Sequence, residues 1–117
     1  MKYKSMEERP WGRFFVIEDQ KNFKIKKIEV EIGQRLSYQY HKKRSEVWVI
    51  ITGTGIVTIN DKKQDFKKDD VIIIPKESKH RIENNGNDVV VFIEIQTGSY
   101  FGEDDIVRIK DDYNRLQ

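Results

Sequence analysis

The chain contains two histidines, His41 and His80, and His41 stands between two further residues that can bind a metal ion. Gln39 precedes it by two positions, so a β-strand would place both side chains on one face. Glu46 follows a short polar stretch, and a hairpin there would bring its carboxylate across from His41. These side chains suit divalent ions such as Zn, Mn, Co, Ni or Fe. The pattern predicts a metal site, with histidines held only by hydrogen bonds as the alternative.

The composition limits the possible chemistry and partners. The chain has no cysteine, so a metal must be held by nitrogen and oxygen ligands and no disulfide can form. Its 22 Lys and Arg are interleaved with 20 Asp and Glu, which is typical of a solvated surface and not of a nucleic-acid track. The N-terminus lacks the apolar region of a signal peptide, and the apolar runs are too short to span a membrane. We therefore expect a cytoplasmic protein that binds neither nucleic acid nor membranes.

Apolar residues recur with period two in short runs bounded by Gly, Asn, Asp and Pro, which predicts an all-β chain. A length of 117 residues fits one domain over residues 1–117. Strands are expected over residues 14–18, 23–32, 36–41, 46–52, 55–60, 71–74, 80–83 and 89–96. Evenly spaced short strands favour a sandwich or barrel, of which the jelly roll is one form.

Irregularities are expected at two places in this pattern. The alternation slips within residues 23–32, which predicts a β-bulge near Lys26 and Lys27. Residues 98–117 mix acidic and basic side chains and could hold a short helix or an ordered tail.

The potential ligands lie within a pattern that resembles the two cupin motifs. The first motif is matched by Gly33, Gln39, His41, Glu46 and Gly53, and the second by Pro75, His80 and Asn84. Gln39 stands where many cupins carry another histidine. Asp69 and Glu77 stand where the motif usually has glycine, so the turns there are expected to differ in detail. The resemblance implies a cupin double-stranded β-helix, which is a jelly-roll barrel. It also implies one divalent metal ion per chain (Zn, Mn, Co or Ni), held by Gln39, His41, Glu46 and His80.

A more specific resemblance covers nearly the whole chain. It rests on Arg-Pro-Trp-Gly at 9–12 and on the runs at 39–48, 74–84, 93–108 and 111–115. These stretches are similar to the type II mannose-6-phosphate isomerase domain, often the C-terminal half of bifunctional enzymes that also carry mannose-1-phosphate guanylyltransferase. No Gly-rich nucleotide loop occurs in the chain, so guanylyl transfer is not expected.

The resemblance implies a metal-dependent interconversion of mannose 6-phosphate and fructose 6-phosphate through an enediol, in GDP-mannose and polysaccharide biosynthesis. Two alternatives stay open at this point. One is a non-catalytic cupin that binds a sugar phosphate. The other is a metal-dependent oxygenase, because histidines with a carboxylate also suit Fe(II).

An isomerase needs a base, and with both histidines assigned to the metal it must be a carboxylate, a lysine, a tyrosine or metal-bound hydroxide. Glu94 alternates with Phe92 and Gln96 and could face the barrel interior, so it is the leading candidate, and Glu103 is the second. The alternative for Glu94 is a buried acid held by hydrogen bonds. Gln96, on the same strand face, is a candidate for substrate binding.

A phosphate group favours arginine, which can bind it through two hydrogen bonds. Arg44 lies between two ligands, so it is a candidate for both catalysis and substrate binding, with Arg108 the second phosphate contact. Arg81 and Arg115 also lie in the family-like stretches, although a solvated or ion-paired role fits them equally well. Several strands are apolar on both faces, from which we expect a homodimer that covers the outer face.

Overall fold

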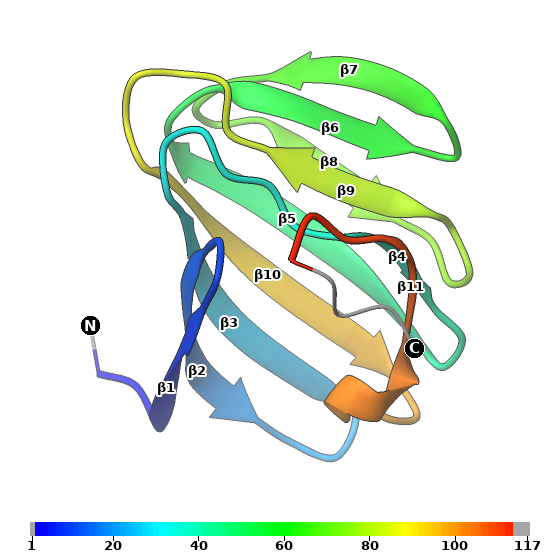
Figure 1. The fold of residues 1–117 in the computed structure, drawn as a ribbon. Helices are drawn as coiled ribbons and strands as arrows, with labels where there is room; N and C mark the ends of the chain where they lie inside the picture. The colour runs from blue at the N-terminus through cyan, green and yellow to red at the C-terminus, as the bar shows by residue number, and fades with distance from the viewer. Residues whose placement is uncertain (1, 114–117) are drawn as a thin grey trace.

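The chain folds into two antiparallel β-sheets that face each other (Figure 1). The computed structural model describes residues 2–113. The larger sheet has the strand order β1-β2-β3-β10-β5-β8, and the smaller has the order β11-β4-β9-β6-β7. The strands of the larger sheet are β1 (Ser5–Arg9), β2 (Gly12–Asp19), β3 (Phe23–Val30), β5 (Arg44–Thr52), β8 (Val71–Ile74) and β10 (Val90–Gly98). Those of the smaller sheet are β4 (Tyr38–His41), β6 (Gly55–Ile59), β7 (Lys62–Phe66), β9 (His80–Glu83) and β11 (Ile106–Lys110).

A short 3-10 helix, η1 (Glu103–Asp105), connects β10 to β11. Within residues 2–113, no helix is long and apolar enough to cross a membrane. Along a strand, every second side chain points into the interior between the two sheets. In β5, for example, Glu46, Trp48 and Ile50 are buried while Val47 and Val49 are only partly covered.

The inner face of the larger sheet, which points into the barrel, is apolar at one end and polar at the other. Side chains that pair across antiparallel strands share a face. Ile28 pairs with Phe92, which pairs with Ile50, and this row forms part of the core. The next inward row contains Lys26 and Glu94, which are paired with each other.

The polar region extends further along the larger sheet and also includes side chains of the smaller sheet. Glu94 pairs with Trp48, and the following inward row contains Gln96 beside Glu46. In the smaller sheet, Arg108 pairs with Gln39, and Gln39 pairs with His80. Polar side chains from distant parts of the sequence therefore meet at one end of the barrel.

The expected strands are confirmed with shifts of a few residues at their ends, and three strands were missed. β1 and β7 are predominantly polar and exposed, so they lack the apolar alternation that identifies a strand. β11 lies in the segment that was expected to form a short helix or tail. That segment contains both the short helix η1 and a strand that pairs with β4.

The bulge was placed in the wrong strand. β3 pairs with β10 without interruption from Phe23 to Val30. The irregularity lies in the neighbouring β2, between Val16 and Glu18, opposite Ile25 and Lys26. The apparent slip in β3 arises because Lys26, a charged residue, occupies an inward position at 4% exposure.

Asp69 and Glu77 stand in turns where the cupin motif usually has glycine. Both residues adopt positive φ, of 74° and 67°, which is the left-handed conformation that glycine adopts freely. The amide of Glu77 donates to the carbonyl of His41 over 2.8 Å, which ties this turn to β4. A residue other than glycine can therefore occupy each of these turns, although adopting the left-handed conformation costs it on the order of 1 kcal/mol.

The outer face of the larger sheet carries a continuous group of aliphatic side chains. In one row Ile73, Val47, Ile95 and Ile25 are cross-strand neighbours, and in the next row are Val71, Val49 and Ile93. We call these seven residues the outer apolar face. Val71 and Ile73 are 61% and 65% exposed, so part of this face is open in the single chain. The expected homodimer remains a prediction.

Candidate metal centre and substrate cavity

Three of the four expected ligands form a compact buried cluster. His41 ends β4, Glu46 lies near the start of β5, and His80 begins β9. One potential ligand atom from each lies within 4.8 Å of the others, and the two imidazole rings are 5.2 Å apart. Each residue is at most 3% exposed. This arrangement could hold a metal ion between the two sheets.

The protonation of these residues suits metal binding. The Nδ1 atom of His80 is 2.9 Å from the carbonyl oxygen of Ser78, so Nδ1 must carry the hydrogen. Its Nε2 atom then has a free lone pair, and within the described chain this atom is buried without a hydrogen-bond partner. Burial lowers the pKa of His80, and it lowers the pKa of His41 to about 4. Both rings are therefore neutral at physiological pH, as metal ligation requires.

Glu46 is ionised and firmly positioned. Burial favours its neutral form, but attraction to His41 and His80, whose rings are protonated at acidic pH, and to Arg44 outweighs burial and lowers the pKa of Glu46 to about 2. The indole N–H of Trp48 donates to Oε1 over 2.9 Å, and Nε of Arg44 donates to Oε2 over 3.1 Å. A carboxylate held in this way keeps a fixed direction toward the histidines.

Arg44 interacts mainly with His41, Glu46 and the chain around them. Its Nη2 atom is 2.9 Å from Nε2 of His41, and its Nη1 atom donates to the carbonyl of Phe101 over 3.3 Å. With the bond to Glu46, all three guanidinium nitrogens have protein partners, and the residue is 3% exposed. The structure therefore places Arg44 as a neighbour of the candidate ligands His41 and Glu46.

Gln39, the fourth expected ligand, lies next to His80 and faces the cavity beside the cluster. The two residues are cross-strand neighbours in β4 and β9. Its Oε1 atom accepts a short hydrogen bond from the hydroxyl of Ser37. A neutral amide oxygen already engaged in this way is a weaker ligand than an imidazole or a carboxylate.

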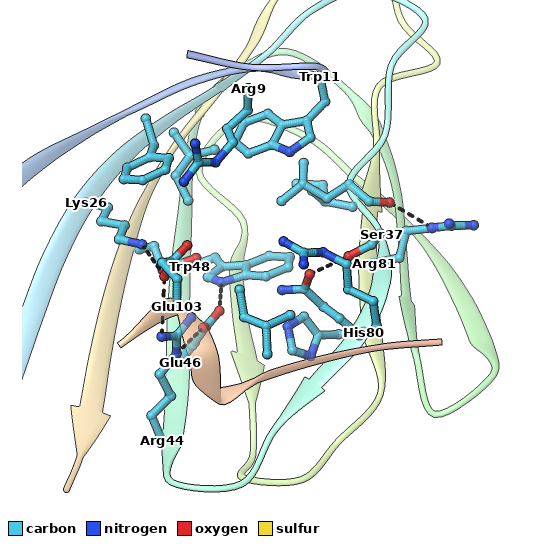
Figure 2. Close-up of a pocket in the computed structure, with 18 residues that line it drawn as sticks. Arg9, Trp11, Lys26, Ser37, Arg44, Glu46, Trp48, His80, Arg81 and Glu103 are labelled. Atoms are coloured by element: carbon cyan, nitrogen blue, oxygen red, sulfur yellow. Dashed lines mark hydrogen bonds and ion pairs between the residues drawn. The ribbon is translucent and has the colours of Figure 1, made fainter. Parts of the chain in front are cut away.

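The cavity beside the cluster is rich in positive charge (Figure 2). Its charged and polar lining comprises Arg9, Lys26, Arg44, Arg81, Arg108, Glu46, Glu94, Glu103, Gln39, Ser37 and His80. Five cations thus face three carboxyl groups. Figure 2 shows Arg9 and Trp11 toward one end, Arg44 and Glu46 toward the other, and Lys26 with Glu103 along one wall. Such a cavity suits an anionic ligand with hydroxyl groups.

Glu94 faces this cavity, as its alternation predicted. It is 6% exposed, and the side-chain amide of Gln96 donates a short hydrogen bond to its Oε1 atom. Burial, followed by repulsion from Glu46, raises the pKa of Glu94 to about 8. The nearby charges of Lys26 and Arg44 act in the opposite direction. Glu94 is thus a buried carboxyl group outside the metal cluster, with a proton affinity suited to acid–base chemistry.

The other predicted residues have different surroundings. Gln96 is fully buried beside Glu94 and is not part of the cavity lining. Glu103 is half-exposed, 3.2 Å from Nζ of Lys26 and 3.8 Å from Nη1 of Arg44. Arg81 lines the cavity while donating to the carbonyls of Leu36 and Lys110. Arg115 lies outside the described residues.

The model of the mannose-6-phosphate isomerase C-terminal family matches residues 1–111. The chain belongs to this family. Over 107 residues it is 45% identical to a mannose-1-phosphate guanylyltransferase of Klebsiella pneumoniae and 42% identical to the alginate biosynthesis protein AlgA of Pseudomonas aeruginosa. Both alignments cover 92% of this chain but only 23% and 22% of those proteins. The chain therefore spans less than a quarter of these relatives.

Solved structures confirm the cupin double-stranded β-helix. The capsular polysaccharide assembling protein CapF of Staphylococcus aureus matches with a TM-score of 0.76 at 20% identity, over 91% of this chain and 34% of that chain. The cupin domain of Cnp3 from Schizosaccharomyces pombe matches with a TM-score of 0.71 at 19% identity, over 81% and 69%. At these identities the likeness establishes the fold alone.

Sequence reasoning missed Lys26 as a cavity residue. Its ammonium group is 3.2 Å from Glu103 and 4.3 Å from the centre of the Phe14 ring. A lysine buried to this extent is uncommon, because its charge loses most of its hydration. The signal was present as a charged residue at an inward position in the alternation of β3. Arg9 was also missed, although it lies in one of the family-like stretches.

Proposed function

We propose that the chain is a metal-dependent isomerase that interconverts mannose 6-phosphate and fructose 6-phosphate. One observation carries the proposal: two residues of the metal-binding cluster, Glu46 and His80, line the same cavity as a separate buried carboxyl group, Glu94. An aldose–ketose isomerase needs both an electrophile for the carbonyl oxygen and a group that moves a proton between neighbouring carbons. Membership of the family supports the same reaction.

His41, Glu46 and His80 would hold one divalent ion, with Gln39 as a weaker fourth ligand. The lone pair of His80 Nε2 and the ionised Glu46 fit such an ion, and the nitrogen and oxygen donors suit Zn, Mn, Co or Ni. When bound, the ion supplies Lewis-acid polarisation of the sugar carbonyl. Arg44 and Trp48 keep Glu46 in place from the other side.

Glu94 is the proposed base. As a carboxylate it would take the proton from C2 of open-chain mannose 6-phosphate while O1 gains a proton, which gives the enediol. It would then return a proton to C1 while the O2 hydroxyl loses its own, which gives fructose 6-phosphate. Gln96 orients this carboxyl group through its hydrogen bond. Glu103 is the second candidate, but its pairing with Lys26 makes it less suited to accept a proton.

The cationic cavity supports an anionic substrate. Arg108 is the first candidate for the phosphate contact, because it lines the cavity and is the cross-strand neighbour of Gln39. Arg81 is a further candidate. The three guanidinium nitrogens of Arg44 already have protein partners. Arg44 therefore remains a substrate-binding candidate only for the part of the sugar near C1 and C2. Two relatives carry names from alginate and xanthan biosynthesis, and we place this chain in the same supply of mannose phosphates.

A coupled assay tests the proposal. The purified chain is stripped with EDTA, reloaded with each candidate metal and supplied with mannose 6-phosphate, and formation of fructose 6-phosphate is followed. We expect turnover that depends on metal and is absent from His80→Ala. Lack of turnover by wild type that has bound both metal and sugar phosphate would contradict it. Oxygen consumption with bound iron would support an oxygenase instead.

A non-catalytic sugar-phosphate-binding cupin is the second candidate. In the metal-free chain the raised pKa of Glu94, about 8, leaves most of this carboxyl group protonated at neutral pH, and a carboxyl group that stayed protonated would bind the sugar without isomerising it. Calorimetric titration separates the two. Saturable binding of mannose 6-phosphate without isomerisation at any pH between about 6 and 9 would support the binding protein, since this range spans the titration of Glu94.

A further inference from the structure

The segment between β10 and β11 contacts the turn between β4 and β5, the two strands that carry His41 and Glu46. His41 and Glu46 lie on either side of this turn, which contains Lys42 and Lys43. The amide of Ser99 donates to the carbonyl of Lys43 over 3.1 Å. Figure 1 shows the chain passing from the end of β10 through η1 into β11. Residues far from the ligands in sequence thus hold the turn from outside.

β4 depends on this segment for its position. On one side it pairs with β9 at a single position, Gln39 with His80. On the other side it pairs with β11 at four positions, including His41 with Ile106. His41 is therefore held from the β11 side by its pairing with Ile106, in addition to the hydrogen bond that its carbonyl accepts from the amide of Glu77.

Asp105, the last residue of η1, makes the most specific contact with the turn. Its Oδ1 atom accepts from the amide of Lys42 over 3.2 Å, and its Oδ2 atom accepts from the amide of Lys43 over 3.0 Å. The residue is 8% exposed. A buried carboxylate is costly unless it is well paired, and here both of its oxygens bind consecutive amides.

We propose that Asp105 is a positioning residue for the metal centre, which sets the spacing of His41 and Glu46 by fixing the turn between them. The inference rests on the proposed metal site. A metal ion tolerates ligand displacements of only about 0.2 Å, so loosening this turn should weaken binding even where the fold persists. Replacing a residue that orients metal ligands typically lowers the metal affinity by about 10- to 100-fold.

The test uses a graded pair of variants and a matched control. Asp105→Asn keeps the shape but offers one acceptor oxygen, so one amide loses its partner, and Asp105→Ala removes both acceptors. Asp104→Asn is the control, because Asp104 is in the same helix but exposed, and its bond runs to Tyr100. Co²⁺ affinity is measured by calorimetry, the ligand geometry by the visible spectrum of bound Co²⁺, and stability by melting in EDTA.

We expect the dissociation constant to rise in the order wild type, Asn, Ala, by about 10-fold or more for Asn, with an altered Co²⁺ spectrum. Amide hydrogen exchange at Lys42 and Lys43 should accelerate in the metal-free variants, a readout that needs no metal. Asp104→Asn should match wild type in all of these. Wild-type Co²⁺ affinity in Asp105→Asn, or unchanged exchange at the two amides, would overturn the inference and leave the proposed metal site standing. Failure of wild type to bind any metal would overturn both.

Discussion

Replacing Glu94 by glutamine should make the metal-free protein more stable at alkaline pH than wild type. Burial and repulsion from Glu46 raise the pKa of Glu94 from its ordinary value of 4.5 to about 8. The folded state therefore holds this proton more tightly than the unfolded state does. Its contribution to stability is fully present below pH 4.5 and is lost as pH rises toward 8.

The size of the effect follows from the same values. Each pH unit between 4.5 and about 8 is worth about 1.4 kcal/mol, so wild type loses at most about 5 kcal/mol across this window through Glu94. Glutamine is close in shape and does not ionise, so the variant lacks this loss. The titrations of His41, His80 and Glu46 occur in both proteins and largely cancel when the two are compared.

Urea unfolding in EDTA at about pH 5 and about pH 9 measures this difference, because the two values bracket the titration. We expect Glu94→Gln to differ little from wild type at the lower pH and to exceed it by up to about 5 kcal/mol at the higher pH. Glu31→Gln, which alters an exposed carboxylate, serves as the control. A difference between Glu94→Gln and wild type that does not change with pH would refute the assignment of Glu94 as a buried group with a raised pKa.

Three further predictions concern the metal, the phosphate and the assembly. His41→Ala and His80→Ala should abolish metal binding while Gln39→Ala only weakens it, because imidazole is the stronger ligand; full metal content in both histidine variants would exclude this site. Arg108→Gln should raise KM for mannose 6-phosphate by about 10-fold or more with metal content unchanged, since a hydrogen bond to a charged group is worth about 1.5–3 kcal/mol. Unchanged kinetics would place the phosphate elsewhere. The outer apolar face predicts a homodimer, and a monomeric mass in light scattering at micromolar concentration would count against it.

The grouping of His41, Glu46 and His80 was largely predictable because most of its geometry is local, while their role as metal ligands stays a prediction. Strand parity and one hairpin were enough to group Gln39, His41 and Glu46, and the family-like motif added His80. The inward direction of Glu94 followed from alternation in β10. These inferences used only neighbouring residues or a motif, and neither requires knowledge of which strands pair.

The residues that surround the ligands were harder to predict because their partners are distant in sequence. Lys26 breaks the apolar alternation of β3 and so suggests a bulge, whereas its partner Glu103 lies 77 residues away and on a 3-10 helix. Asp105 contacts the turn only once β11 has paired with β4. The polar strand β7 gave no apolar alternation at all. Such features follow from the tertiary arrangement and not from local pattern.

The central claim is tested most directly by following mannose 6-phosphate in D₂O by NMR with metal-loaded wild type and metal-loaded Glu94→Gln. Proton transfer through an enediol predicts that wild type forms fructose 6-phosphate with deuterium at C1, to the extent that the proton exchanges with solvent. The variant should bind the sugar but form product about 10²- to 10⁴-fold more slowly. No fructose 6-phosphate from wild type that binds both metal and sugar, or equal rates for the two proteins, would contradict the account.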